Sequence, residues 1–193
     1  MDPIKLELRL HKNEIYFPST DDFKLINKIE NSIIYYNTEL YTYNNVEYDS
    51  ISYMINYIYN GAIGCGNCCF PASKKLGFHN IDRERIKILI DKETGEPKYV
   101  YFSAHASEGK WYSYDKCEKN KDGNLIIYSA LDSHANYPHS GRWLRIFGFA
   151  NDKCSSKGEH IVPELILLPT YSYNPQNKDN NTFKFRFCLP CYM

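Results

Sequence analysis

The chain has 193 residues, which is the size of one folded domain, and we expect a single domain spanning residues 1–193. Its 23 lysine and arginine residues are balanced by 23 aspartate and glutamate residues. This balance argues against nucleic acid as a partner, because phosphate backbones are bound by basic surfaces. No apolar run is long enough for a transmembrane segment and no signal peptide is visible, so we expect a soluble protein, cytoplasmic by default.

The first third of the chain predicts strands and one helix. Residues 4–10 alternate apolar and charged side chains, as a strand with one solvated face does. A short helix is expected at residues 23–29, with its N-cap at Ser19 or Thr20. Alternating patterns predict further strands at residues 32–36, 40–48 and 51–59, the first two around an Asn-rich turn.

The middle of the chain predicts a β-hairpin. A turn-rich section follows residue 59, and a strand is expected at residues 82–90. The turn at Gly95 joins it to a partner strand at residues 98–105. The antiparallel register then brings His105 beside Asp82 or Glu84, to within a residue or two.

The last third predicts more short strands, at residues 125–130, 142–150, 161–168 and 182–187. A polar loop lies before the last of them. Aromatic residues make up 16% of the chain, which suits half-buried sheet surfaces. We therefore expect an all-β fold, namely an antiparallel β-sandwich with long loops and at most one or two short helices.

Two carboxylates mark the candidate site. Asp82 and Glu84 share one face of their strand with three isoleucines, while the basic residues between them point the other way. Partly desolvated carboxylates repel each other unless a proton or a cation intervenes. We predict a divalent cation, calcium or magnesium, held by Asp82, Glu84 and His79. The alternative is that lysine or arginine side chains from another strand pair with both acids.

Four further polar residues could belong to the same site. They are His105 at the end of the hairpin, His134 and Asn136 in an S-H-A-N-Y loop, and Asp152. If the protein were an enzyme, His105 or His134 would be the general base acting on metal-bound water. The alternative for the loop residues is that their side chains stabilise turns.

Seven cysteines include two C-x-x-C pairs. A tetrahedral zinc could use Cys65, Cys68, Cys188 and Cys191. Reduced, buried or disulfide-bonded cysteines are the alternatives, and reduced thiols are the default without a signal peptide.

Several motifs resemble one family in the same order. They are E-I-Y-F-P-S, Y-I-Y-N-G, G-F-H-N-I-D-R-E-R-I, V-Y-F-S-A-H, I-Y-S-A-L-D-S-H-A-N-Y-P-H-S-G and F-G-F-A-N-D. This series resembles the family named after yeast vacuolar protein sorting protein 62, from about Glu14 to Asp152. Its most specific part is S-H-A-N-Y-P with the following A-N-D.

The H-x-x-D-x-E arrangement is more distantly similar to the G-H-R-H-D-W-E heptapeptide of necrosis- and ethylene-inducing-peptide-like proteins. That resemblance implies a sandwich fold, a divalent cation near the heptapeptide and binding of sphingolipid head groups. It places His79, Asp82 and Glu84 at the heptapeptide's histidine, aspartate and glutamate. This chain has Arg83 where the heptapeptide has tryptophan.

The leading hypothesis is a non-enzymatic binding protein whose cation site shapes a pocket for a polar ligand, such as a sugar or a lipid or glycolipid head group, possibly at a membrane surface. Aromatic side chains could supply stacking faces beside it, namely Trp111, Tyr112, Tyr114 and Tyr137. A metal-dependent hydrolase is one alternative. A structural or virion assembly subunit is another, with its oligomeric state open.

Overall fold

The computed structural model describes residues 1–10, 33–60, 79–105, 108–131, 133–145 and 151–168. The side chains of residues 58–60 and 79–81 lie outside this description. So do the predicted helix at residues 23–29 and the predicted strand at residues 182–187. Within the described ranges the regular structure consists of strands and one short 3-10 turn, η1 (Tyr114–Lys116). The predicted all-β class is confirmed.

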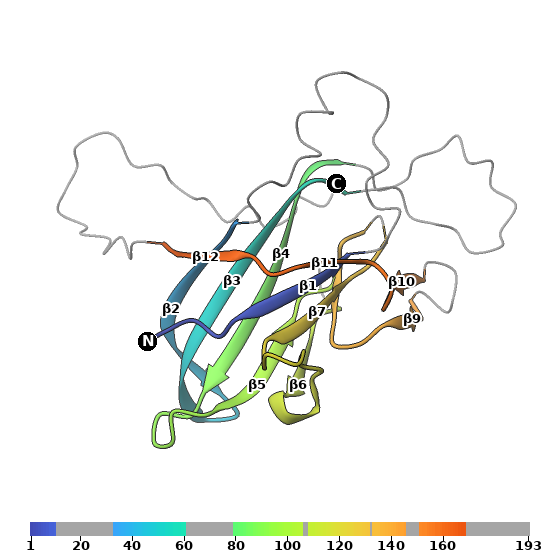
Figure 1. Ribbon diagram of the computed structural model, residues 1–193. Helices are drawn as coiled ribbons and strands as arrows, with labels where there is room; N and C mark the ends of the chain where they lie inside the picture. Colours follow the sequence, from blue (N-terminus) through green and yellow to red (C-terminus); the bar gives the residue numbers. More distant parts are fainter. Residues whose placement is uncertain (11–32, 61–78, 106–107, 132, 146–150, 169–193) are drawn as a thin grey trace, which may run out of the picture.

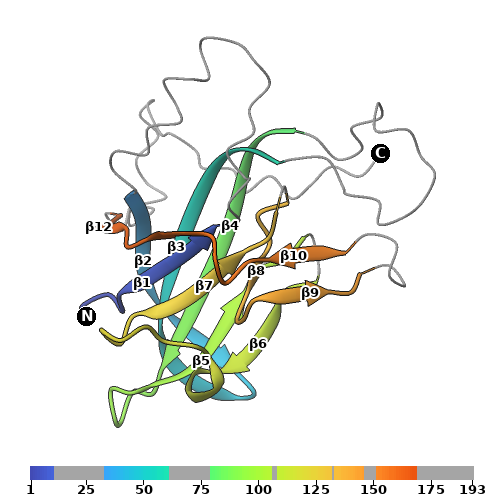
Figure 2. The ribbon, with the colours of Figure 1, turned by 45° about the vertical axis from the view of Figure 1, so that its right-hand side comes forward.

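The strands form two sheets and a separate two-stranded ribbon (Figure 1). The larger sheet has the order β12 (Glu164–Leu167), β2 (Ile33–Tyr43), β3 (Val46–Asn60), β4 (His79–Ile90), β5 (Pro97–Phe102), β6 (Lys110–Ser113). The smaller sheet has the order β11 (Glu159–Ile161), β1 (Leu6–Leu10), β7 (Leu125–Ser129), β8 (Asn136–Tyr137). The ribbon pairs β9 (Gly141–Trp143) with β10 (Asp152–Cys154) and lies beside both sheets in Figure 2.

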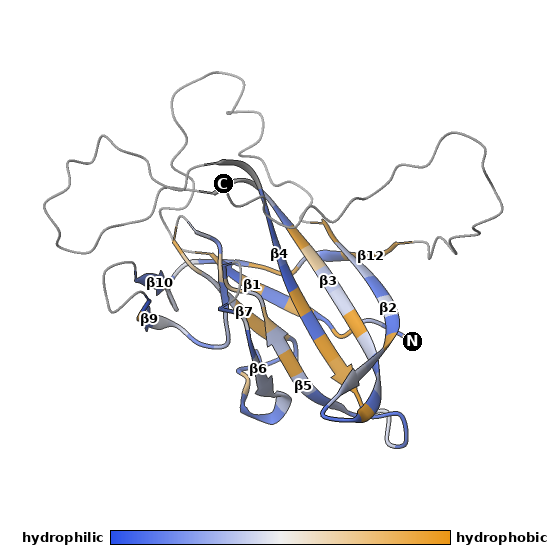
Figure 3. Cartoon of the chain, turned by 180° about the vertical axis from the view of Figure 1, so that it is seen from behind, coloured by the Kyte–Doolittle hydropathy of each residue, from blue (hydrophilic) through white to orange (hydrophobic). Residues whose placement is uncertain are grey.

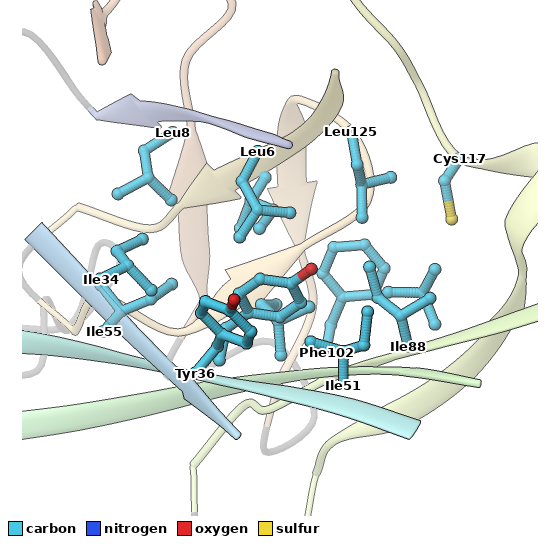
Figure 4. Packing of buried hydrophobic residues seen from close by; sticks show 14 of the residues in the cluster. Leu6, Leu8, Ile34, Tyr36, Ile51, Ile55, Ile88, Phe102, Cys117 and Leu125 are labelled. Carbon is cyan, nitrogen blue, oxygen red and sulfur yellow. The ribbon is translucent and has the colours of Figure 1, made fainter. Parts of the chain in front are cut away.

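The two sheets pack face to face around one apolar core, as a sandwich does. Leucines of β1 and β7 meet isoleucines of β3 and β4 between the sheets, as the close-up in Figure 4 shows. Two of the strand pairs are parallel, β1 with β7 and β12 with β2, so both sheets are mixed. The antiparallel expectation therefore holds for the hairpins but not for these two pairs, which join segments far apart in the sequence.

Alternation along β4 decides which side chains enter the core. Ile86, Ile88 and Ile90 are buried between the sheets, and each contributes about 1.5–3 kcal/mol through burial. Apolar and polar residues alternate along β3 and β4 in Figure 3. Asp82 and Glu84 continue the same face toward the start of β4, and both are also buried. The sequence pattern therefore carries two carboxylates into the space between the sheets.

An aromatic cluster on the outer face curls the larger sheet. The Trp111 ring on β6 lies 4.8 Å from Tyr43 and 5.7 Å from Tyr41, both on β2. In a flat sheet β2 and β6, which are four positions apart, would be roughly 19 Å from each other. The short ring distances therefore mean that the sheet is strongly curved. Leu89, whose side chain points to the same outer face, is fully buried. The prediction that Trp111 stacks beside the acidic residues is therefore wrong, because it faces the opposite side of the sheet.

The turn between β2 and β3 gives a first testable prediction. Asn44 and Asn45 both have left-handed backbones, with φ of 50° and 62°, as a two-residue turn of type I′ requires. Glycine adopts this conformation without a Cβ clash, so Asn45→Gly should raise the free energy of unfolding by about 0.5 kcal/mol. Urea denaturation would measure the change. Asn56→Gly, in the extended strand β3, is the control and should be destabilising; a gain there and a loss at Asn45 would contradict the assignment.

Candidate functional site

Polar side chains from four separate segments meet at the open end of the space between the sheets. These residues are Asp82 and Glu84 of β4, Ser103 and His105 after β5, Ser133, His134, Asn136 and Tyr137 in and before β8, and Asp152 of β10. Six of them, the two acids of β4 with His134, Asn136, Tyr137 and Asp152, are buried. The sequence patterns that were widely separated in the chain therefore contribute to one site.

Glu84 is the most perturbed acid of the group. Burial raises the pKa of its carboxyl well above the ordinary value, and the nearby carboxylates of Asp82 and Asp152 raise it further. The Ser103 hydroxyl donates a hydrogen bond to Glu84, which acts in the opposite direction. Because the raising effects dominate, the ionised form of Glu84 is disfavoured unless a positive charge lies near it.

Asp82 contacts a buried histidine. Nδ1 of His134 lies 3.3 Å from Oδ2 of Asp82, and the imidazole stacks on the Tyr57 ring with 4.0 Å between centroids and 5° between planes. Tyr57 is paired with Asp82 across β3 and β4, so the imidazole of His134 contacts two neighbouring residues of the larger sheet. The histidine is thereby fixed in position, with one ring nitrogen directed at the carboxylate.

Asp152 accepts hydrogen bonds from several elements at once. Tyr137 donates from its hydroxyl at 2.6 Å, Ser133 at 2.9 Å, and Nε2 of His105 lies 2.8 Å away. A nitrogen of Arg145 lies 3.8 Å from the same carboxylate. Burial would raise the pKa of Asp152, but these partners together hold it below its ordinary value. Asp152 is therefore ionised and ties the ribbon to the site.

Both candidate histidines have strained backbones. His105 has a φ of 48° and His134 a φ of 52°, which is the left-handed region that non-glycine residues seldom occupy. Such conformations persist where the surrounding contacts impose them, and they are concentrated at functional sites. Here the contacts are the hydrogen bonds to Asp152 and Asp82.

Two buried oxygen atoms in the same region lack hydrogen-bond partners among the described residues, Oδ1 of Asn136 and Oγ of Ser129. Asn136 is 1% exposed and Ser129 is fully buried. The two residues are directly paired across β7 and β8, so their side chains lie on the same face. Asn136 also contacts Ser103, the hydrogen-bond donor to Glu84. Sequence reasoning did not identify Ser129 or Ser103, since a single serine carries no pattern of its own.

The alternative of lysine or arginine partners for the two acids of β4 has no support in the described ranges. The ion pairs found there include none between a lysine or arginine and Asp82 or Glu84. The same ranges contain no group of three histidine, cysteine or carboxylate side chains arranged to hold a metal. The side chain of His79, the third predicted ligand, lies outside the description.

The predicted register of the central hairpin is confirmed, with Ile86 opposite Phe102 and Ile88 opposite Val100. The predicted neighbours of His105, Asp82 or Glu84, differ from the one in the structure. The chain leaves β5 after Phe102 and turns at His105, whose imidazole is bonded to Asp152 and not to Asp82 or Glu84. His105 therefore reaches the site through Asp152.

A cleft of about 400 Å³ opens beside the acidic cluster. Tyr112, Asn136, Tyr137 and Trp143 line it, together with the ion pair between Arg145 and Glu108. Tyr112 and Tyr137 were predicted as stacking faces, and both border this cleft. Tyr114 instead packs against the apolar core.

The predicted zinc ligands Cys65, Cys68, Cys188 and Cys191 lie outside the described residues. Cys117 and Cys154 are buried. Burial raises the pKa of the Cys117 thiol to about 11, so it is protonated and unreactive at neutral pH. Among the described residues, no helix has the length and apolar character needed to cross a bilayer.

Comparisons with known proteins give one family and two similar solved structures. The family model described as vacuolar protein sorting-associated protein 62 matches residues 46–158. A solved structure described as a toxin fold for microbial attack and plant defense is 15% identical, with a TM-score of 0.48, covering 85% of this chain and 70% of its own. Necrosis and ethylene inducing protein 2, from the causal agent of cocoa's witches' broom disease, is 14% identical, with a TM-score of 0.45 and the same coverage. No curated protein matches the sequence.

Proposed function

The chain belongs to the vacuolar protein sorting-associated protein 62 family, and we propose that it is a non-enzymatic binding protein built around a divalent cation. Asp82 and Glu84 would hold the ion between the sheets. The cleft beside them would receive a polar ligand, a sugar or a lipid head group. The observation that carries this proposal is that two adjacent buried carboxylates have no lysine or arginine partner in the described parts of the chain.

The electrostatics favour a cation. Two buried carboxylates on one strand face, with Asp152 close enough to raise the pKa of Glu84, are unfavourable in an ionised state unless a positive charge is near. The imidazole of His134 contacts Asp82. Among the described residues Glu84 has the Ser103 hydroxyl as its partner and no ion pair with a histidine, lysine or arginine. A bound divalent ion would remove the repulsion and allow both carboxylates to ionise.

The donor atoms favour a hard ion such as Ca²⁺ or Mg²⁺. The carboxylates, the amide oxygen of Asn136 and the hydroxyl of Ser129 are all oxygen donors, and calcium is bound by six to eight oxygens, water included. The last two atoms are buried without hydrogen-bond partners in the described ranges, which costs free energy that coordination of an ion would offset. His79 stays a predicted ligand, and zinc at the cysteine pairs stays a separate prediction.

A calcium titration tests the cation. In protein stripped with EDTA, calcium or magnesium should raise the melting temperature, because an ion present at about 100 times its Kd stabilises the fold by about 2.7 kcal/mol. Isothermal titration calorimetry should show one site, lost in Asp82→Asn. Glu93→Gln, an exposed residue in the turn of the same hairpin, should bind the ion like the wild type. An unchanged melting temperature with both ions, together with no metal by elemental analysis, would refute the cation.

A further inference from the structure

The ion pair between Arg145 and Glu108 joins the two segments that border the cleft. Glu108 precedes β6 and Arg145 follows β9, and both line the cleft of about 400 Å³. Nε of Arg145 lies 2.5 Å from one carboxylate oxygen of Glu108, and a terminal nitrogen lies 3.4 Å from the other. Two nitrogens of one guanidinium therefore face two oxygens of one anion. Arginine offers this same fork to carboxylate and phosphate groups.

The guanidinium has contacts that hold it in place without Glu108. The backbone N–H of Arg145 donates to Oδ1 of Asn151 at 3.2 Å, and a terminal nitrogen lies 3.8 Å from the buried carboxylate of Asp152. The Arg145 side chain is 11% exposed and lines the cleft, so a ligand there can contact it. The cation would therefore keep its position if the Glu108 side chain moved away.

Glu108 is the partner that can leave. Its side chain is 39% exposed, and ion pairs with an exposed member contribute little to stability. Its backbone is held, because its N–H donates to the carbonyl of Ala104 at 3.1 Å. The next residue, Gly109, packs so closely that an added Cβ would lie 2.9 Å from the backbone oxygen of Phe102. Rotation of the Glu108 side chain toward solvent would therefore free Arg145 without a shift of the backbone.

A second cation borders the same cleft. Lys110 is exposed, lines the cleft and has no ion-pair partner among the described residues. Asp152 offsets part of the charge of Arg145, so Lys110 supplies the charge that remains available to a ligand. A phosphate monoester has three terminal oxygens, two for the guanidinium fork and one for the ammonium group, whereas a carboxylate has only two. The pair of cations therefore suits a phosphate better than a carboxylate.

We propose that the cleft binds a phosphate monoester, with two oxygens at the guanidinium of Arg145, in place of the Glu108 carboxylate, and the third at the ammonium group of Lys110. The proposal rests on the proposed function, since it names the ligand class of the same cleft, but neither cation is a ligand of the proposed metal ion. Leu144, which is 75% exposed and lines the cleft, would cover the apolar part of the ligand. The phosphate could belong to a lipid or to a free metabolite.

Calorimetry with phenyl phosphate tests this class, on metal-free protein from which EDTA has been dialysed away. We expect saturable binding at millimolar concentrations, and at least about tenfold weaker binding of benzyl alcohol, which has the ring without the phosphate. Glu108→Gln should strengthen phenyl phosphate binding by about tenfold, because the competing carboxylate and its repulsion are lost. Glu47→Gln is the matched control, since it breaks another exposed ion pair, with Lys92, and should bind like the wild type.

Two variants of the cations complete the test. Arg145→Lys keeps the charge near Asp152 but lacks the fork, and it should weaken phenyl phosphate binding by at least about tenfold. Lys110→Gln should weaken it by at least about threefold. Because Lys110 is exposed, this variant keeps the test decisive even if Arg145→Lys does not fold. Cosedimentation with vesicles of phosphatidic acid in phosphatidylcholine would identify a lipid source, and binding of phenyl phosphate alone a free one.

An absence of phenyl phosphate binding, equal binding of benzyl alcohol, or unchanged or weaker binding in Glu108→Gln would each overturn the proposal and leave the ion pair as a structural link. The calcium titration on the same preparation decides the cation separately. Calcium binding without phenyl phosphate binding would contradict the ligand class alone. If neither binds, the ligand class and the proposed function are both wrong.

Discussion

Replacing Asp152 with alanine should lower the free energy of unfolding by about 3–5 kcal/mol, which is the usual cost of breaking a buried charged network. Tyr137, Ser133 and His105 all bond this carboxylate, and all three would lose their partner. Arg145 would also keep only Glu108. Urea denaturation followed by tryptophan fluorescence would measure the loss.

The pH dependence separates charge from packing at this position. The folded-state pKa of Asp152 is below the unfolded value of 3.8, so its ionised form stabilises the fold. That contribution is fully present above the unfolded pKa and is lost as the pH falls through the folded one. The stability gap between the wild type and Asp152→Asn should therefore be constant above about pH 5 and narrow below about pH 4.

Asp115→Ala is a matched control for the alanine variant, since Asp115 is exposed on η1. Its stability should lie within about 0.5 kcal/mol of the wild type. A loss of less than about 1 kcal/mol in Asp152→Ala would mean that the network around Asp152 does not hold the ribbon.

Glu84→Gln should raise the free energy of unfolding in EDTA, whereas Asp152→Ala should lower it. The change removes a carboxyl whose ionised form is disfavoured by burial and by Asp82 and Asp152, and it keeps an acceptor for Ser103. We expect the metal-free variant to be more stable than the wild type by about 1–3 kcal/mol at pH 8. Thermal and urea unfolding in EDTA would measure the difference.

The sign of its pH dependence follows from the raised pKa. A carboxyl whose pKa is higher in the folded state than the unfolded value of 4.5 takes up a proton on folding, so the wild type gains stability as the pH falls. The advantage of Glu84→Gln should therefore shrink from pH 8 toward pH 4.5. With calcium the order should reverse, because only the wild type binds the ion through this carboxylate. A variant less stable than the wild type in EDTA at pH 8 would contradict both the raised pKa and the proposed cation.

Local patterns in the sequence were enough to predict β1, β4, β5 and β7 and the register of the central hairpin. Alternation places Asp82 and Glu84 on the face of the three isoleucines, and a turn at Gly95 fixes which residues of β5 lie opposite. The S-H-A-N-Y loop and Asp152 were identified as site candidates, and they lie with the two acids. The strands and the register depend on periodicity and turn chemistry, both of which are local.

The remaining contacts depend on how distant segments meet, which periodicity does not encode. His105 has a left-handed backbone conformation and does not continue β5. Its imidazole therefore contacts Asp152 instead of Asp82 or Glu84. Trp111 faces outward because β6 contributes only alternate residues to the core, and the curl of the sheet then covers its ring with tyrosines. Parallel pairing of β1 with β7 has no turn in the sequence to indicate it.

The position of β1 also determines when the sandwich can close during synthesis. Leu6–Leu10 is translated before both of its neighbours, Leu125–Ser129 and Glu159–Ile161. Until these have been made, β1 has no strand to pair with, although β3 and β4, against which its leucines pack, have already been translated. Pairings so distant in sequence form slowly, and unpaired strands of this kind are prone to aggregate. The backbone N–H and C=O groups of β1 therefore lack sheet partners until β7 and β11 have been made.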